Sequence, residues 1–411
     1  MFHDPYQSGF RPGYSTETAL VALMDDLSRA RDRGFSSVLV LLDLSAAFDT
    51  IDHGILLQRL GGVGVGSTVL WWFSSYLSGH SQTVLAGGRR STPRYLTCGV
   101  PQGSVLSPLL FNIYMKPLGE IIRGFGVSYH QYADDTQLYI CTPGHISDAL
   151  SVMSHCLEAV RIWMDRNMLR LNPAKTEWLC IPTSRSSLDV PFWSWGGGVA
   201  PCGQGTEPGG PPGLMAQIGG AGGGRGQGAF AQIRLVHQLR PFLDRDALRT
   251  VTQALVISRL DYCNALYLGL PLCTTRRLQL VQNAAVVMGA SRYSHVTPLL
   301  RNLHWLPVAL WVRFKVLVLT FKVQHGMGPG YLQEQLLPTS NTNCPVRAHR
   351  QGLLRVPSAT QCRLAATRGR AYSVAAPTLW NLLLLELRLT PDLRTFRHDL
   401  KTWLFLQSGL C

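Results

Sequence analysis

Residues 128–140 read SYHQYADDTQLYI, and this stretch decides the fold. Two runs rich in Tyr, Thr and Ile, Ser128–Ala133 and Thr136–Ile140, are typical of β-strands. Because two residues separate them, the stretch predicts a tight hairpin. Such turns favour Asn-Gly or Asp-Gly, since they need positive φ. Here the pair is Asp134-Asp135, two carboxylates that repel each other. When the residues of a turn do not suit its backbone conformation and bring no visible structural advantage, the pattern indicates a functional site.

A third carboxylate, Asp43, follows the apolar run Val38–Leu42 (VLVLL). The length and branching of this run suit a strand buried on both faces. A charge at its end is costly unless it faces a cation or solvent. Carboxylate oxygens suit Mg²⁺, which also keeps waters and accepts substrate phosphates. The three carboxylates therefore fit a two-metal phosphoryl-transfer site. The alternative is a solvated loop tip, with Asp43 as a helix cap.

Four motifs share one order along the chain. They are Leu41–Asp49 (LLDLSAAFD), Gly99–Pro108 (GVPQGSVLSP), Tyr132–Asp135 (YADD) and Leu171–Glu177 (LNPAKTE). Together they closely resemble reverse transcriptases of LINE-type non-LTR retrotransposons. The resemblance covers about residues 6–182. It resumes within 229–411 in runs such as Ser258–Leu266 (SRLDYCNAL) and Leu303–Pro307 (LHWLP).

The resemblance implies an α+β right-hand polymerase. Partial fingers and a palm, an antiparallel sheet with helices on one face, would precede a mainly helical, thumb-like C-terminal region. The implied activity is RNA-directed DNA synthesis with two Mg²⁺ ions, or Mn²⁺ in their place. The implied partners are an RNA template, a DNA primer and a dNTP, without a membrane or a small-molecule cofactor. A nuclear location follows, cytoplasmic when the protein is bound to its RNA. The alternative is a catalytically inactive retroelement remnant that only binds nucleic acid.

The resemblance also assigns the catalytic residues. Asp43 and Asp134 match the metal-binding carboxylates of the palm, and Asp135 matches the third acidic residue, which is less directly tied to the metals. Lys175 matches the lysine proposed to protonate the leaving pyrophosphate. A solvated surface lysine is the alternative for this residue.

Residues at the nucleotide are assigned in the same way. Phe48 matches the position that stacks under the incoming sugar and excludes a 2′-hydroxyl, although an ordinary core Phe is the alternative. Gln102 and Gly103 match the turn beside the incoming nucleotide and the template. Trp71 and Trp72 are expected to be packing residues rather than residues that stack on bases.

Composition divides the chain into three zones, residues 1–182, 183–228 and 229–411. In Gly196–Gly228, 15 of 33 residues are glycine. Such a segment buries too little apolar surface to offset its entropy, so a disordered linker or an insertion is expected. The family has a primer-gripping strand pair at this place. Because only 42 residues precede Asp43, the chain is also expected to be an N-terminally truncated member.

Charge is concentrated in the third zone. Residues 1–228 carry 16 basic and 17 acidic side chains, whereas residues 229–411 carry 22 basic and 7 acidic ones. A polyanion is therefore the expected partner of the third zone. The candidate phosphate contacts are Arg276, Arg277, Lys315 and Lys322. With 46% apolar residues, the chain is not a disordered polymer, and its ten cysteines form no C-x-x-C pair.

Overall fold

The computed structural model describes residues 3–181, 191–194, 198–201, 224–287, 295–339, 351–358, 360–363 and 365–407. The chain forms two compact units. The first unit comprises Met1–Ala19 and Arg33–Gly203, and the second comprises Leu20–Asp32 and Gln204–Cys411. Helix α1 (Thr16–Asp32) therefore contributes most of its length to the second unit. No sequence pattern indicated this, and the division into three zones stays a prediction.

A four-stranded antiparallel sheet is the centre of the first unit. Its strands are β1 (Ser36–Leu42), β7 (Ser128–Tyr132), β8 (Asp135–Thr142) and β10 (Glu177–Ile181), in the order β10-β1-β8-β7. The apolar run of β1 pairs on both edges, with β10 and with β8. Val38, Leu39 and Val40 have no exposed surface. The prediction of a strand buried on both faces is therefore confirmed.

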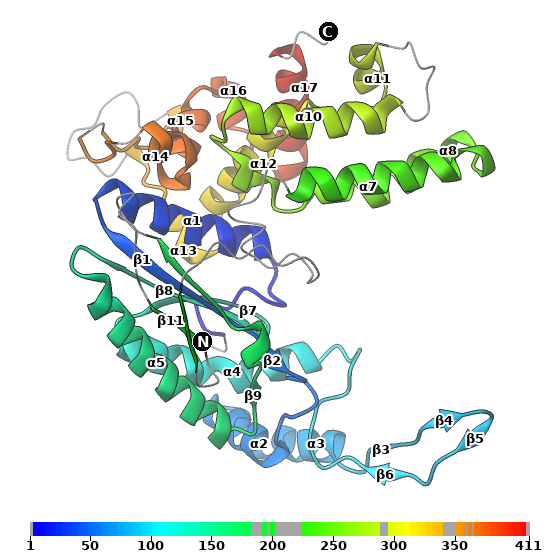
Figure 1. Cartoon of the computed structure of the whole chain (residues 1–411), viewed down its shortest axis with the longest axis vertical. Helices are drawn as coiled ribbons and strands as arrows, with labels where there is room; N and C mark the ends of the chain where they lie inside the picture. The colour runs from blue at the N-terminus through cyan, green and yellow to red at the C-terminus, as the bar shows by residue number, and fades with distance from the viewer. Residues whose placement is uncertain are drawn as a thin grey trace. The chain divides into compact units, whose positions relative to one another are not determined.

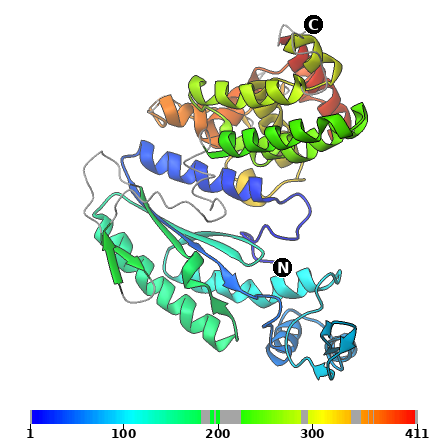
Figure 2. The same cartoon turned by 45° about the vertical axis from the view of Figure 1, so that its right-hand side comes forward.

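Two long helices lie together on one face of this sheet (Figures 1 and 2). They are α4 (Ser107–Gly124) and α5 (Ile146–Arg166). Each has an apolar stripe at helical spacing, which lets one side pack while the other meets water. Phe111 and Tyr114 of α4 are fully buried in the resulting core, as is Val160 of α5. This arrangement confirms the predicted α+β fold with helices on one face of an antiparallel sheet.

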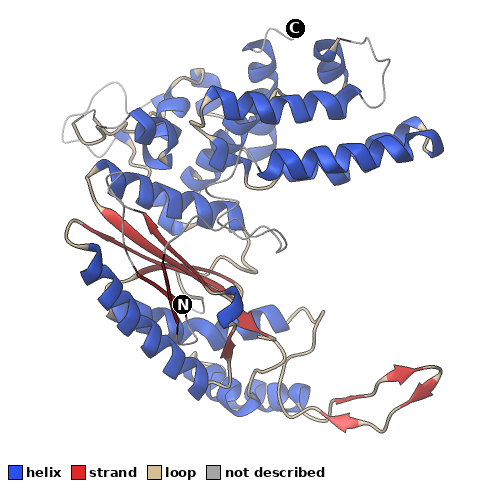
Figure 3. Ribbon diagram, in the orientation of Figure 1, coloured by secondary structure: helices blue, strands red, loops and turns tan. Residues whose placement is uncertain are grey.

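Smaller elements complete the first unit. Strand pairs outside the main sheet hold short segments together, and β3 to β6 form an arm that extends beyond α3 (Figure 3). The remaining elements are α2 (His53–Gly62), α3 (Ser67–Leu77), β2 (Leu44–Ser45), β3 (Ser81–Gln82), β4 (Leu85–Ala86), β5 (Arg89–Arg90), β6 (Arg94–Tyr95), β9 (Arg170–Leu171), β11 (Pro191–Ser194) and β12 (Gly198–Pro201).

The two tryptophans of α3 are largely exposed, although Trp72 packs on Phe73 and Tyr76 as expected. Trp71 is 73% exposed and Trp72 is 49% exposed. Leu70 and Phe73 face the core instead. Because neighbouring positions on a helix point in different directions, residues between two core-facing positions turn outward. Trp72 stacks instead on Tyr76, with ring centroids 5.5 Å apart.

The Gly-rich zone lies largely outside the described residues. Within it, the backbones of β11 and β12 pair as an antiparallel ladder, from Pro191 opposite Pro201 to Ser194 opposite Gly198. The rest of residues 183–223, on which the expectation of a disordered linker or an insertion mainly falls, lies outside the described residues. The following helix, α7, begins at Gly224.

The second unit is helical and is built around α12 (Val308–Gln324). Nine of the residues of α12 are buried, as expected for a helix that is apolar nearly all round. Phe321 stacks on Phe396 of α17, with centroids 4.3 Å apart. The other helices are α7 (Gly224–Leu239), α8 (Arg245–Thr252), α9 (Ser258–Asp261), α10 (Leu272–Val287), α11 (Val296–Asn302), α13 (Gly330–Gln333), α14 (Ala365–Arg370), α15 (Tyr372–Asn381), α16 (Leu385–Arg388) and α17 (Leu393–Gln407).

The N-terminal helix is anchored in this unit by a buried carboxylate. Asp25 of α1 is fully buried and accepts a hydrogen bond of 2.7 Å from the backbone N–H of Ser373. Burial raises the pKa of Asp25. Of the helices that the structure describes, none has the length and apolar character needed to cross a membrane.

Candidate active site

The acidic hairpin turns one residue earlier than its sequence indicated. Tyr132 pairs with Asp135, so the two turn residues are Ala133 and Asp134. Ala133 has the positive φ, +58°. This backbone conformation is uncommon for a residue with a Cβ and must be stabilised by its surroundings. Asp134 is thereby placed at the tip, while Asp135 belongs to the ladder.

A glutamine from the N-terminal segment holds this turn. The side-chain oxygen of Gln7 accepts a hydrogen bond from the N–H of Ala133 at 2.9 Å. Its side-chain nitrogen donates to the carbonyl of Ala133 at 3.1 Å. Both backbone groups of the positive-φ residue are therefore satisfied by one buried amide. The same oxygen also accepts from the N–H of Gly9 at 2.8 Å.

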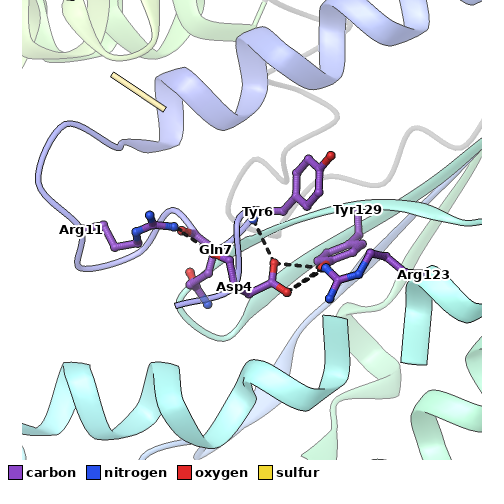
Figure 4. Close-up of polar contacts among 6 residues, drawn as sticks. All are labelled: Asp4, Tyr6, Gln7, Arg11, Arg123 and Tyr129. Atoms are coloured by element: carbon purple, nitrogen blue, oxygen red, sulfur yellow. Dashed lines mark hydrogen bonds and ion pairs between the residues drawn. The ribbon is translucent and has the colours of Figure 1, made fainter. Parts of the chain in front are cut away.

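A buried carboxylate fixes the same segment to the sheet, as Figure 4 shows. Asp4 is 2% exposed and accepts hydrogen bonds from the hydroxyl of Tyr129 on β7, at 2.8 and 2.9 Å. Arg123 of α4 forms an ion pair with Asp4 at 2.9 Å. Backbone bonds continue the attachment, because the N–H of Gln131 donates to the carbonyl of Tyr6 at 3.0 Å. Residues 4–9 therefore buttress the acidic hairpin, a role that no sequence motif indicated.

Strand pairing brings the third carboxylate to the hairpin. In the β1–β8 ladder, Leu42 lies opposite Thr136. Continuing this register by one step sets Asp43 opposite Asp135. Opposed residues in antiparallel strands have Cα atoms about 4.5–5.5 Å apart and side chains on one face. The structure therefore brings Asp43 together with the hairpin acids, although 91 positions separate Asp43 from Asp134.

Lys175 is also at this site. Its ammonium lies 3.2 Å from the carboxylate of Asp43. A 3₁₀ turn, Pro173–Lys175, presents the lysine. The backbone N–H of Asn172 donates to the carbonyl of Asp43 at 2.9 Å, which fixes the start of this turn. The sequence left open whether Lys175 was a solvated surface residue, and the structure pairs it with Asp43.

Charge repulsion at the site changes the affinity of the acids for protons. Burial, followed by the neighbouring charges of Asp134 and Asp43, raises the pKa of Asp135 to about 6. Burial and Asp43 also raise the pKa of Asp134. Lys175 opposes both shifts, yet they remain positive. One ammonium therefore does not neutralise the three acids, and a cation of higher charge would favour their ionised forms.

The donor set fits Mg²⁺ in its chemistry. Within the described ranges, no three His, Cys, Asp or Glu side chains are arranged as a ready-made metal cage. Mg²⁺ does not need one, because it binds through one or two carboxylates together with waters and substrate phosphates. Asp43 and the hairpin acids supply hard oxygen ligands of this kind. The ammonium of Lys175 is the positive charge now beside Asp43.

Phe48 is both packed and accessible. Its ring stacks on Phe111 of the core, with centroids 4.4 Å apart, and meets the edge of Phe10 at 6.1 Å. The side chain is nevertheless only half-buried. The Phe48 ring therefore packs against the core while part of its surface stays accessible. Phe10 was not expected at this place.

The turn that follows β6 lies near the same segment. The side-chain amide of Gln102 is exposed and donates to the carboxylate of Asp49 at 2.8 Å. Gly103 has a φ of +81° and open space around it. Gly99, at a φ of +88°, closely approaches the backbone of Asp49, where an added Cβ would lie 3.0 Å from its carbonyl oxygen. Gln102 and Gly103 are therefore available to a ligand, and Gly99 serves the internal packing of the site.

The basic candidates all lie in the second unit. Arg276 and Arg277 are exposed on α10. Lys322 is half-buried on α12. Lys315, also on α12, forms an ion pair with Asp261 at 3.0 Å. Of these residues, the two arginines present the most accessible charge.

Comparison with known sequences identifies the family. Residues 1–206 match the family described as "Reverse transcriptase (RNA-dependent DNA polymerase)". The chain belongs to the reverse transcriptase family. The sequence relatives show that it is of the LINE type, so the resemblance carried by the four motifs is confirmed.

Three similar proteins illustrate the relationship. A probable RNA-directed DNA polymerase from transposon BS of Drosophila melanogaster is 29% identical over 181 residues, which is 42% of this chain and 19% of the relative. The RNA-directed DNA polymerase from mobile element jockey of Drosophila funebris is 27% identical over 175 residues, 41% of this chain and 19% of the relative. A telomerase structure from Candida albicans, in complex with a fragment of telomeric RNA, has 12% identity and a TM-score of 0.35, covering 76% of this chain and 52% of that one. The sequence matches span about a fifth of each curated relative.

Gly9 provides a test of the buttress under the hairpin. In Gly9→Ala the new Cβ would lie 2.3 Å from the backbone nitrogen of Ala133. Because the Gln7 bonds hold that backbone in place, we expect the free energy of unfolding to fall by about 1–3 kcal/mol. Amide hydrogen exchange at residues 131–135 should accelerate more than in the rest of the sheet. Chemical denaturation and exchange mass spectrometry measure the two effects.

Gly62→Ala is the matched control, because an added Cβ there meets nothing within 4 Å. This variant should unfold at the same denaturant concentration as the unchanged protein or a higher one. Equal losses of stability in both variants would contradict the proposed role of the buttress.

The raised pKa of Asp135 predicts a pH-dependent stability difference. The folded state holds the proton of Asp135 more tightly than the unfolded state does, so ionisation opposes folding between about pH 4 and about pH 6. With EDTA present, Asp135→Asn should gain stability relative to the unchanged protein as pH rises through this window. Asp148→Asn, an exposed site on α5, should show no such trend. Denaturant unfolding at pH 4, 5, 6 and 7 provides the measurement, and parallel curves for all three proteins would refute the prediction.

Proposed function

We propose that this chain catalyses RNA-directed DNA synthesis, with nucleotidyl transfer from a dNTP to a primer 3′-hydroxyl. One observation carries the proposal: the β1–β8 register sets Asp43 beside the acidic hairpin. Carboxylates converging at adjacent strand ends suit two-metal phosphoryl transfer. The membership of the chain in the reverse transcriptase family supports the same reaction.

Asp43, Asp134 and Asp135 would hold the divalent ions that reverse transcriptases generally use. When bound, these ions would activate the primer 3′-hydroxyl and stabilise the oxygen that leaves. The residues of the chain would contribute by positioning the reactants, and positioning accounts for most of the catalysis in phosphoryl transfer. Gln7 fixes the backbone of Ala133, and thus the direction in which Asp134 points. The two metals and the roles of these residues are part of the proposal.

Lys175 would supply a proton to the departing pyrophosphate. In the structure its ammonium is ion-paired with Asp43, and it is 66% exposed. From this exposed position the Lys175 ammonium can move toward an incoming phosphate. Positive charge beside the phosphates also favours the developing negative charge of the leaving group.

Phe48 and Gln102 would select the nucleotide. The Phe48 ring is fixed by its stack on Phe111, so it cannot easily move away from a 2′-hydroxyl. Gln102 is held by Asp49 and lies on a turn with an accessible glycine after it. The proposed partners are an RNA template, a DNA primer and a dNTP, and the proposed place of action is the nucleus. The alternative, a remnant that only binds nucleic acid, is not favoured by a site whose acids and lysine lie together.

Primer extension tests the activity. With an oligo-dT primer, a poly-rA template, dTTP and Mg²⁺, the chain should extend the primer. Asp134→Asn keeps the size of the side chain but removes the charge, so extension should fall by about 10²–10³-fold, the scale of losing one electrostatic stabiliser. Asp148→Asn removes an exposed carboxylate of the first unit outside the site and should extend like the unchanged protein.

A chain that binds the primer–template but does not extend it would overturn the proposed reaction in favour of the remnant. Equal extension by Asp134→Asn and the unchanged protein would instead overturn the assignment of this residue. Circular dichroism of each variant confirms that loss of activity is not loss of the fold.

Phe48→Ala tests selection against ribonucleotides. Removing the ring opens space at the sugar, so the ratio of kcat/KM for dTTP to that for UTP should fall about tenfold or more, or about 1.4 kcal/mol of discrimination. The ratio is independent of the fraction of active protein, so partial loss of the Phe111 stack does not obscure the result. Phe10→Ala should leave the ratio unchanged, because the Phe48 ring keeps its stack on Phe111 without the contact to Phe10. An unchanged ratio in Phe48→Ala would remove Phe48 from this role.

A further inference from the structure

The second unit contains a cavity of about 930 Å³ that the proposed polymerase reaction does not use. Its lining residues belong to the helical stretch that ends with α9, to the turn after α11, and to helices α12 and α17. Cavities of this size commonly accommodate a ligand of several rings. The lining has two chemical characters, aromatic and cationic, on different walls.

The aromatic wall consists of Trp305, Trp311 and Phe314. Trp305 precedes α12, and the other two lie on α12 one turn apart. All three are half-buried, so each packs against the unit on one side and offers surface to the cavity on the other. Trp305 and Trp311 pack against the core of this unit. Flat rings of this kind are platforms for nucleobases.

The cationic wall is one face of α17. Arg394, Arg397 and Lys401 line the cavity at a spacing of three and four residues, which places them on the same side of the helix. No ion pair joins Arg397 or Lys401 to a carboxylate in the part of the chain that the structure describes. The single acid of the lining, Asp261, forms an ion pair with Lys315 at 3.0 Å.

The positive charges on this wall act on one another. Burial and the adjacent Arg397 lower the pKa of Lys401. Like charges four residues apart weaken a helix unless another charge compensates them. An anion in the cavity would provide that compensation. The positively charged third zone of the sequence, residues 229–411, thus contains a cavity lined by both cationic and aromatic side chains.

We propose that this cavity binds unpaired nucleotides of single-stranded RNA, with bases against Trp305, Trp311 or Phe314 and phosphates on Arg397 and Lys401. Single-stranded nucleic acid combines the two chemistries of the lining in a regular repeat. A duplex hides its base faces and cannot use the aromatic wall. The site is separate from the carboxylates, and its binding needs neither a metal nor polymerase activity.

The test is fluorescence anisotropy with a 5′-fluorescein-labelled 12-nucleotide RNA of unstructured sequence. The full chain carries Asp134→Asn, and EDTA is present, so that failure of the polymerase reaction cannot affect the result. The double variant Arg397→Ala/Lys401→Ala should bind at least about tenfold more weakly. The slope of log K against log salt should also decrease by about 1.4, because each phosphate contact to a single strand contributes about 0.7.

Arg245→Ala/Arg249→Ala is the matched control, since it removes two exposed charges at the same spacing from α8 of the same unit. It should keep both the affinity and the salt slope. Equal losses in the two double variants would overturn the proposal, because they would show that only the overall charge matters. A loss confined to Arg276→Ala/Arg277→Ala would also overturn it and place the RNA on α10.

Phe314→Ala and Phe314→Tyr test the aromatic wall. The alanine variant should bind about tenfold more weakly, while the tyrosine variant, which keeps the ring, should bind like the unchanged protein. Competition distinguishes RNA from a free nucleotide: the unlabelled 12-mer should displace the probe far better than uridine monophosphate at the same nucleotide concentration. Equal displacement by the mononucleotide, or equal binding of a 12-base-pair duplex, would refute a site for single strands.

Discussion

The antiparallel pairing of β1 with β8 is the constraint on which the site depends. Both strands alternate their side chains across the sheet, so a slip of one residue would turn Asp43 away from the hairpin acids. The register is fixed because β1 is paired on both edges and buried on both faces. The contacts that pack the core therefore also set the positions of the three carboxylates. A change in the packing of β1 would move Asp43 relative to the hairpin acids.

Contacts from another segment of the chain hold the turn of the acidic hairpin in an unfavourable backbone conformation. Ala133 has a positive φ without being a glycine, and the amide of Gln7 satisfies both of its backbone groups. The Asp4 network fixes the segment that carries Gln7. Strain of this kind persists only where the surroundings over-determine it, and it is common at functional sites. Residues 4–9 therefore hold in place the turn that carries Asp134.

Each unit contains a cluster of like charges, which is negative in the first unit and positive in the second. In the first unit, burial and the repulsion between converging carboxylates raise the pKa of Asp135. In the second unit, cations of α17 line one wall of a cavity, where burial and Arg397 lower the pKa of Lys401. A divalent cation would relieve the first excess of charge and a phosphate chain the second. Both would be present in the reaction that we propose.

Local patterns of strand propensity and motif order were enough to predict the hairpin, the buried strand, the family and the acids of the candidate site. Charge along the chain also separated a basic C-terminal zone from a neutral N-terminal one. Long-range contacts were needed to show that Ala133 takes the positive φ, that Gln7 holds it, that Trp71 faces solvent and that Arg397 shares a cavity with Trp305. Each of these depends on which distant segments meet. Such meetings follow from strand register and helix packing, whose long-range contacts leave no periodic trace in a single sequence.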